Sequence, residues 1–301
     1  MTPVLRATSP VILPALILVM FEPFALAQVP VFPGAVGFGT DTRAAYGATS
    51  NPVICVVNTL LHRQGQLAGA TDGNAPDGTA TRNGIPVAEG SLLECLGYAP
   101  PANTGKVILF EVSGTIWATS TPYEYRVEHP HTTLAGQSAP SPGITLRNIH
   151  FQVRDSEVLV QHLRSRVGDA VDGPDAGNRR SVTIMSTSQK AINNVVVDHF
   201  TATWGVDTCF TVWEGPSNPV TNVTVSNSLI AEGLHDSIHP DGHPHSKGLA
   251  LQVRTQHISA IGNLIMSNDD RNPYVRWGSK VVVNNLVYNV REFVARSGQP
   301  P

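Results

Sequence analysis

Short apolar runs, each broken by a polar turn, follow one another along the last two thirds of the chain. The clearest five carry a histidine or asparagine at the break: VLVQHLRS (158–165), VVVDHFTA (195–202), VTVSNSLI (223–230), SAIGNLIM (259–266) and VVVNNLVY (281–288). The apolar residues on both sides of each break do not alternate strictly, which favours parallel strands buried inside a coil over the alternating strands of a β-sandwich.

The polar residues of these runs lie 37, 28, 36 and 22 residues apart: His162, His199, Asn227, Asn263 and Asn285. Such spacing is typical of a β-solenoid in which some coils carry inserted loops. We predict that these five side chains occupy the same inward corner of successive coils, where they hydrogen-bond the turns above and below.

The segments before this repeat are more varied. The run 106–116 (KVILFEVSGTI) predicts a buried strand, and Gly90 to Leu96 predicts a short helix with Ser91 as its cap. Residues 28–50 and 69–90 are rich in glycine and small or polar residues, so we expect an irregular segment lying against the fold and a surface loop.

The N-terminus has the order of a secretory signal peptide. Arg6 precedes the apolar run 11–20, and the small-residue pattern Ala25-Leu26-Ala27 follows. The apolar run is short of the roughly 20 residues that a membrane span needs. We therefore predict a signal peptide at 1–27, secretion without a membrane anchor, and one mature domain at 28–301.

Composition supports a turn-rich β fold. Charged residues make up only 14% of the 301 residues, while glycines number 26 and prolines 23. The formal net charge of −3 gives no overall basic field of the kind that draws proteins to nucleic acid or anionic membranes. Any site for an anion must be local.

The chain has three cysteines, Cys55, Cys95 and Cys209. In an oxidising compartment Cys55 and Cys95 could pair, which would leave Cys209 as a small buried apolar residue. Sequence does not fix the distance between them, so the pairing stays open at this point.

Three cations stand out in the stretch from His245 to Val290: Lys247, Arg271 and Arg276. Each is next to a short apolar run, so stacked coils would bring them to one face. Three cations on one face predict a site for a polyanion, although each alone is typical of a solvated surface charge.

Several longer phrases, in order from about residue 33 to residue 290, resemble the pectate lyase superfamily, and its secreted bacterial branch in particular. They are VGFGTDTRAAYG (36–47), VILFEVSGTI (107–116), TLAGQSAPSPGITL (133–146), VLVQHLRSRVGD (158–169), VVVDHFTATW (195–204), IAEGLHDS (230–237), HSKGL (245–249), NDDRNPYVRWG (268–278) and VVNNLVYN (282–289). The resemblance implies an all-β fold, a right-handed parallel β-helix of the single-stranded pectin lyase-like kind. It also implies a monomeric lyase that cleaves polygalacturonate or a related acidic polysaccharide by calcium-assisted β-elimination.

Carried over by matching motifs, the resemblance gives roles to the three cations. Arg271 of RNP takes the place of the proton-abstracting arginine. Arg276 of VRWG and Lys247 of HSKGL take the places of substrate-binding residues.

The expected calcium ligands are where the sequence departs from the family. Asn178 and Arg180 stand where carboxylates are expected, and Asp207 is kept while Thr211 stands four residues later. Calcium prefers several oxygen ligands, mostly carboxylates. We expect Asp207 and, from the preceding loop, Asp175 to be the metal ligands of a rearranged site, with Asp169 and Asp172 as further candidates.

Two other groups have structural interpretations. We expect Asp198 and His199 to be interior turn residues, Asp198 fixing the loop and His199 occupying the ladder. The histidines His235, His239, His243 and His245 suggest zinc, but the prolines between them and the absence of an HExxH frame favour solvated loop residues.

The C-terminus and the depleted acidic positions leave a second function open. Only 12 residues, Val290 to Pro301, follow the VVNNLVYN run. We therefore expect either a shortened member of the family or a sequence truncated at its C-terminus. The alternative to a lyase is a β-helix that binds acidic polysaccharide without cleaving it.

Overall fold

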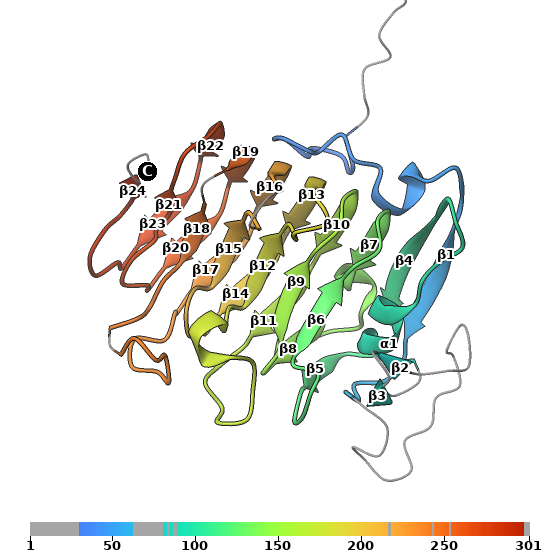
Figure 1. Cartoon of the computed structure of the whole chain (residues 1–301), viewed down its shortest axis with the longest axis horizontal. Coiled ribbons are helices and arrows are strands. Elements are labelled where there is room, and N and C mark those ends of the chain that lie inside the picture. Colours follow the sequence, from blue (N-terminus) through green and yellow to red (C-terminus); the bar gives the residue numbers. More distant parts are fainter. Residues whose placement is uncertain are drawn as a thin grey trace, which may run out of the picture.

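The computed structural model describes residues 30–62, 81–82, 85–86, 90–215, 218–242, 244–252 and 254–297. Its strands form three parallel sheets that run side by side along the molecule (Figure 1). The chain visits the three sheets in turn and returns to the first one coil further on, which makes a right-handed parallel β-helix. The predicted solenoid is confirmed, and the β-sandwich alternative is wrong because the strands of all three sheets are parallel.

The first sheet has eight strands: β1 (Ser50–Val57), β4 (Thr104–Phe110), β7 (Thr132–Ala135), β10 (Val158–Gln161), β13 (Ile192–Asp198), β16 (Val220–Ser226), β19 (Thr255–Ile261) and β22 (Lys280–Val283). The second has seven: β5 (Gly114–Trp117), β8 (Ile144–Arg147), β11 (Leu163–Arg166), β14 (Thr201–Thr203), β17 (Leu229–Ala231), β20 (Leu264–Met266) and β23 (Leu286–Tyr288). The third also has seven: β6 (Glu124–Val127), β9 (His150–Val153), β12 (Val182–Met185), β15 (Phe210–Trp213), β18 (Leu249–Leu251), β21 (Tyr274–Val275) and β24 (Arg296–Ser297).

The remaining elements are short. They are an antiparallel pair, β2 (Thr81–Arg82) and β3 (Ile85–Pro86), one α-helix, α1 (Leu92–Gly97), and three 3₁₀ turns, η1 (Ala44–Gly47), η2 (Gly136–Ser138) and η3 (Ala176–Asn178).

The core lies inside the coil. On β12 the side chains of Val182 and Ile184 point inward and are fully buried, and Phe210 and Val212 repeat this on β15. Because successive strand residues point to opposite faces, each sheet contributes every second side chain to one continuous apolar core. The residues in between face outward and are available for a site.

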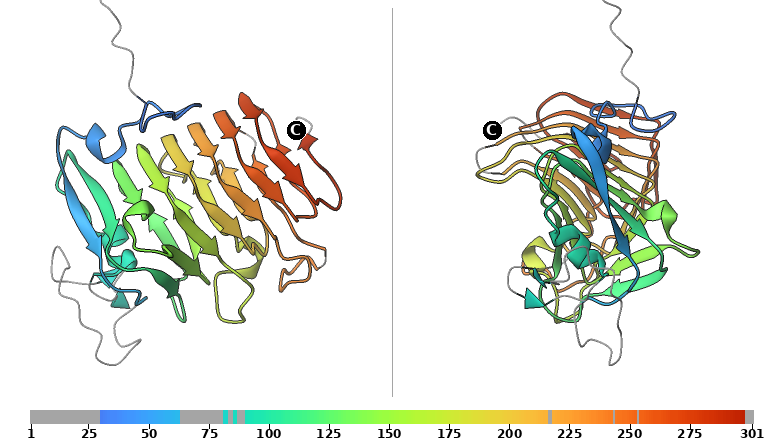
Figure 2. Two further views of the ribbon diagram at one scale, coloured as in Figure 1. Left: turned by 180° about the vertical axis from the view of Figure 1, so that it is seen from behind. Right: turned by 90° about the vertical axis from the view of Figure 1, so that its right-hand side faces the viewer.

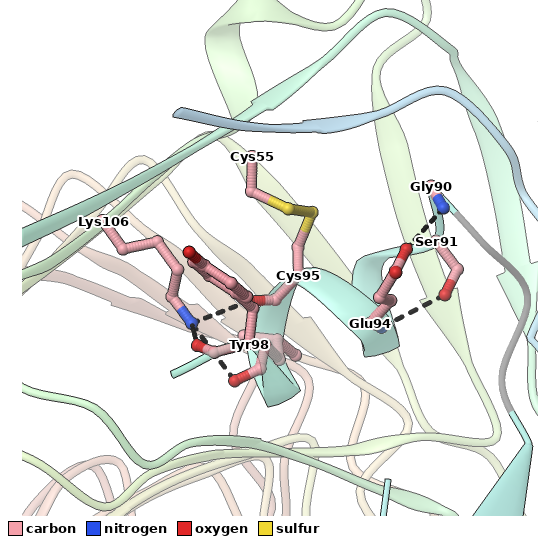
Figure 3. The surroundings of a disulfide bond; sticks show 8 residues. Cys55, Gly90, Ser91, Glu94, Cys95, Tyr98 and Lys106 are labelled. Atoms are coloured by element: carbon pink, nitrogen blue, oxygen red, sulfur yellow. Dashed lines mark hydrogen bonds between the residues drawn. A yellow bond between two sulfur atoms is a disulfide. The ribbon is translucent and has the colours of Figure 1, made fainter. Parts of the chain in front are cut away.

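Helix α1 packs at the β1 end of this core (Figure 3). As predicted, Ser91 caps it: its Oγ accepts a hydrogen bond from the Glu94 amide at 3.1 Å. At the other end, Lys106 Nζ donates to the carbonyl oxygens of Cys95 and Tyr98, both at 2.7 Å. The buried lysine thus neutralises the negative end of the helix.

A disulfide joins Cys55 on β1 to Cys95 on α1 (Figure 3). The pairing that the sequence left open is therefore present. Cys209 is free and fully buried, and burial raises the pKa of its thiol to about 12. It is an inert core residue, as expected.

The run 106–116 does not form one strand. It contributes to β4 and β5, which lie in different sheets, and the chain turns between them at Glu111–Ser113. An apolar run can span a coil corner because the inward residues on both sides of the corner reach the same core.

The segment from residue 30 to 48 lies along the outer side of the first sheet (Figure 2). Val31 and Phe32 pack against Leu159 and Val196, and the Phe38 amide donates to Ser259 Oγ at 3.0 Å. The expected irregular segment against the body of the fold is confirmed. The predicted signal peptide at 1–27 and most of the predicted loop at 69–90 lie outside the described residues.

The five residues of the predicted polar ladder fall into two columns, where a column is a set of residues that strand pairing aligns from one coil to the next. Strand pairing aligns His162, His199 and Asn227 with one another, whereas Asn263 and Asn285 belong to the neighbouring column. The first three are exposed and have left-handed backbones, with φ of 55°, 50° and 49°. The prediction that they sit at an inward corner is wrong: histidine and asparagine are there because the turn needs a left-handed residue.

Asn263 and Asn285 behave as predicted. Asn263 Nδ2 donates to the Val225 carbonyl at 3.0 Å, and Asn285 Nδ2 donates to the Ala260 carbonyl at 2.8 Å. These two amides bond the turns of adjacent coils.

Within the described residues, no helix has the length and apolar character required to cross a membrane.

Candidate active site

The turns that lead from the second sheet to the third contain the candidate site. Four of these turns contribute to it, at residues 167–181, 204–209, 232–248 and 267–273. The two longest, 167–181 and 232–248, project at the same edge of the molecule in Figure 1, where they are yellow and orange. They come close to each other at Gly177 and Pro240, since a Cβ added to Gly177 would lie 3.4 Å from Cγ of Pro240.

Strand register aligns three residues of these turns. Val182 pairs with Phe210 and Phe210 with Leu249 at the starts of β12, β15 and β18. Two residues before these starts stand, respectively, Arg180, Thr208 and Lys247.

One coil further on, the position that pairs with Lys247 is Asp270, and Arg271 is the next residue. The bridge between Lys247 and Asp270 is parallel, and Arg271 has a left-handed φ of 59°. Side chains 91 residues apart, from Arg180 to Arg271, therefore become neighbours in space.

Asp207 is the centre of the site. Its Oδ2 accepts a hydrogen bond from Arg180 Nε at 2.6 Å and forms an ion pair with Arg180 Nη2, also at 2.6 Å. Its Oδ1 lies 3.7 Å from Lys247 Nζ and 4.0 Å from Arg271 Nη1. We call Arg180, Lys247 and Arg271 the cation cluster; three cations surround one carboxylate, so the cluster has an excess of positive charge.

Burial and neighbouring charges shift the pKa values of Asp207, Lys247 and Arg271. Burial alone would raise the pKa of Asp207, but the charges of Arg180, Arg271 and Lys247 outweigh burial, so this pKa is lowered. The pKa of Lys247 is lowered by burial and by Arg271. Burial also lowers the pKa of the Arg271 guanidinium, against the opposing charges of Asp207 and Asp270. Burial and crowding thus weaken the hold of both cations on their protons.

Arg271 is fixed by two contacts beyond Asp207. Its Nη1 donates to Thr208 Oγ1 at 2.7 Å, and its Cζ lies 6.0 Å from the centroid of the Tyr274 ring. Arg276 Cζ is also 6.0 Å from the centroid of that ring, so the Tyr274 ring lies near the guanidinium groups of both arginines. Arg276 Nε is buried without a hydrogen-bond partner. Arg276 therefore borders the cation cluster through Tyr274, and no ion pair joins it to Asp207 within 4.0 Å.

Two histidines adjoin the cluster. His245 and His239 are buried, and their rings stack with centroids 3.3 Å apart and planes 15° apart. His245 Nε2 accepts from Lys247 Nζ at 2.5 Å, and burial together with Lys247 lowers the pKa of His245 to about 4. The interpretation of these two as solvated loop residues is wrong, because the 232–248 turn folds back over the sheet. His243 lies outside the described residues.

The residues around Asp207 do not fit calcium. Among the described residues, the group of potential metal-binding side chains within 4.8 Å of one another is Asp207, His239 and His245, with one carboxylate instead of the several that calcium prefers. Asp175 is not in this group: it caps η3, accepting from the Gly177 amide at 3.2 Å and from Asn178 Nδ2 at 2.7 Å.

A transition metal fits no better. The lone pairs of an imidazole lie in the plane of its ring, and two nearly parallel stacked rings cannot both direct a lone pair at one ion. The cation cluster would also repel that ion, at about 4 kcal/mol per unit charge pair at 4 Å for an effective dielectric constant near 20.

Asp198 and His199 lie apart from this site, on the turn between the first and second sheets. The buried Asp198 carboxylate accepts from Gln161 Nε2, Ser226 Oγ and Asn227 Nδ2 at 2.7–3.1 Å, and pairs with His199 Nδ1 at 2.6 Å. Asp198 fixes the turn as predicted. His199 does not occupy the interior: its side chain is 50% exposed.

Sequence reasoning missed three members of the site. The sequence identifies Arg180 only as a replacement for a carboxylate and His245 only as a solvated loop residue, and it gives Thr208 no role. The available signal was the register: each of Arg180, Thr208 and Lys247 stands two residues before a strand that pairs with the next.

Comparisons with known proteins agree with the motif resemblance. The chain is 29% identical over 260 residues to a protein of Aspergillus flavus called probable pectate lyase C, covering 86% of this chain and 48% of that protein. It is 30% identical over 267 residues to the probable pectate lyase C of Neosartorya fischeri, covering 88% and 49%. The chain thus spans about half the length of the curated relatives it matches. No model of a protein family matches it.

Among solved structures, the chain is similar to jun a 1, the major allergen from cedar pollen. The TM-score is 0.54 with 17% sequence identity, and the match covers 84% of this chain and 64% of the allergen. At this identity the likeness concerns the fold alone, and it agrees with the parallel β-helix.

Proposed function

We propose, starting from the membership of this chain in the pectate lyase superfamily, that it is a secreted lyase that cleaves polygalacturonate or a related acidic polysaccharide by β-elimination. The observation that carries the proposal is the cation cluster: Arg180, Lys247 and Arg271 come from three coils and lie within 4.0 Å of Asp207. Isolated, solvated surface cations would not be expected to gather around one carboxylate in this way.

Substrate binding follows from the excess of positive charge. A uronate chain carries one carboxylate on each sugar, and charge-assisted hydrogen bonds from lysine and arginine are the strong ones for such a group. We assign carboxylate binding to Lys247 and Arg276. The unpartnered Nε of Arg276 supports this assignment, because a buried donor is stabilised by an acceptor supplied by the ligand.

Proton abstraction is assigned to Arg271. The proton on C5 of the uronate becomes acidic as positive charge stabilises the developing enolate. An arginine in water remains protonated, but burial and Arg180 lower the pKa of Arg271, and its hydrogen bond to Thr208 fixes its direction. These are the conditions that a guanidine base requires.

The elimination then balances as follows. Arg271 takes the C5 proton, the electron pair of that C–H bond forms the C4–C5 double bond, and the C4–O glycosidic bond breaks. The leaving oxygen takes up a proton from solvent. The products are a shortened chain and a chain that ends in an unsaturated uronate.

The direct test is incubation of the protein with polygalacturonate, followed by ultraviolet absorbance and by mass spectrometry of the products. A lyase gives the conjugated double bond and products without added water, whereas a hydrolase gives saturated products one water heavier. Absence of unsaturated product with every uronan tested, with and without calcium, would overturn the proposal.

A second candidate function is binding of acidic polysaccharide without cleavage. It is favoured by the pairing of Asp207 with Arg180, which occupies the carboxylate that the cation cluster surrounds. Retention of intact acidic chains by the protein, without unsaturated product, would support this alternative.

A further inference from the structure

Arg180 is held rigidly at the start of β12. Its Nε donates to Asp207 Oδ2 at 2.6 Å, its Nη2 lies 2.6 Å from the same oxygen as an ion pair, and its Cζ lies 5.4 Å from the centroid of the Trp213 ring. Its side chain is only 14% exposed. A guanidinium fixed between a carboxylate and an aromatic ring is pre-organised, so little conformational entropy is lost when it binds an anion.

The outer face of the third sheet next to Arg180 carries polar atoms that lack partners. Gln152, Thr183 and Thr211 pair with one another across β9, β12 and β15, and all are at most 2% exposed. Gln152 Oε1 and Thr211 Oγ1 have no hydrogen-bond partner. A buried polar atom without a partner is costly, so the protein's own contacts leave this wall beside Arg180 unsatisfied.

The charge around Asp207 favours an anion over a cation. Asp207 already has Arg180, Lys247 and Arg271 within 4.0 Å, and these exceed its single negative charge. A divalent cation would meet three positive groups there, while a carboxylate would meet three donors.

We propose that Arg180 takes the place of a bound divalent cation in binding the substrate. Its guanidinium, held by Asp207 and Trp213, binds a uronate carboxylate. The chain therefore recognises acidic polysaccharide without any metal. This inference rests on the proposed function in its substrate class, but it concerns binding and can be tested without turnover. Arg180 is thereby a specificity-determining residue for free carboxylates.

The test is calorimetric binding of trigalacturonate to the full chain, in EDTA and in calcium chloride. We expect the dissociation constant of the wild type to agree within about twofold between the two conditions, and Arg180→Gln to weaken binding about tenfold or more. The matched control is Arg164→Gln, since Arg164 lies on β11 in the second sheet and bonds Thr145 and Pro142 there. This control should bind like the wild type.

Calcium alone provides an independent readout. The wild type should give no binding heat with calcium, whereas Arg180→Asp, which places a second carboxylate beside Asp207, should gain calcium binding. Thermal melting of each variant reports whether it is folded, and the comparison of the wild type in EDTA and calcium needs no variant.

The outcomes separate this inference from the proposed function. Wild-type binding that is lost in EDTA and restored by calcium overturns the inference, as does a folded Arg180→Gln that binds like the wild type. Failure of the wild type to bind trigalacturonate in either condition overturns it too. Binding through Arg180 in EDTA without cleavage supports the inference while the lyase proposal fails.

Discussion

Arg271 donates from Nη1 to Oγ1 of Thr208, 63 residues earlier in the chain, at 2.7 Å. The bond exists because two turns of the β-helix stack at the same edge of the third sheet. It fixes the guanidinium to which we assign proton abstraction, next to Asp207 and Lys247, so a neutral threonine controls the geometry of the cation cluster.

Thr208→Val should therefore impair turnover more than binding. The substitution keeps the shape of the side chain and removes the acceptor, so Arg271 loses its directing bond; we expect kcat to fall about tenfold, close to 1.4 kcal/mol, with a smaller change in KM. Steady-state kinetics on polygalacturonate measure both. The control is Thr203→Val, because Thr203 Oγ1 is buried without a partner, so its removal should leave the kinetics unchanged and cause no loss of stability. Equal effects of the two substitutions would contradict the role of Thr208.

Acid should destabilise the protein through His245. Its folded pKa of about 4 lies below the ordinary 6.5, so the unfolded state binds more protons between these values and stability falls as the pH decreases from 6.5 to 4. The groups that face His245 are Lys247, His239 and Asp207. We expect this residue to contribute about 2 kcal/mol to the loss.

The measurement is the melting temperature against pH for the wild type and His245→Gln. The variant should show a shallower decline between pH 6.5 and 4, since it has no imidazole to protonate. Parallel curves for the two proteins would refute this prediction.

The Cys55–Cys95 disulfide should stabilise the N-terminal coil. It closes a loop with a sequence separation of 40, for which loop entropy suggests about 4 kcal/mol as an upper value. Replacing both cysteines by serine should lower the melting temperature, while Cys209→Ala tests an unpaired buried cysteine. In denaturant, alkylation should label one thiol before reduction and three after it. Three labelled thiols without reductant would show that the bridge is absent.

Asp198→Ala should be strongly destabilising. The carboxylate is buried and accepts three hydrogen bonds from the coils on its two sides, so its loss leaves the buried donors of Gln161 and Ser226 unsatisfied at a cost of about 3 kcal/mol. Asp236→Ala is the control, because the Asp236 side chain is 79% exposed. Urea denaturation of both variants measures the difference, and a loss below about 0.5 kcal/mol for Asp198→Ala, typical of surface sites, would contradict the structure.

Much of the fold could be predicted from the sequence because the apolar runs recur at coil spacing. The register could not be predicted to the residue: Asn227 and Asn263 look equivalent in their runs, yet strand pairing places Asn227 beside Gly262 and puts Asn263 one column further. Either asparagine or glycine satisfies a left-handed turn, so composition does not reveal the column.

The site was partly predictable for the same reason. Lys247, Asp207 and Arg271 come together as the motifs implied, but the dominant partner of Asp207 is Arg180. The contact between Arg180 and Asp207 depends on the lengths of the turns at 167–181 and 204–209 and on the burial of both side chains. The periodicity of apolar residues does not encode either property. The burial of His239 and His245 is likewise a property of how the 232–248 turn folds back.

The most direct test of the central claim is the turnover of polygalacturonate by wild type and Arg271→Ala, with trigalacturonate binding measured on the same samples. We predict that the wild type forms unsaturated product and that Arg271→Ala loses at least about 100-fold in kcat, the scale of a lost general base, while it stays folded and still binds. A folded Arg271→Ala with wild-type turnover would contradict the assignment of the cation cluster as the catalytic site.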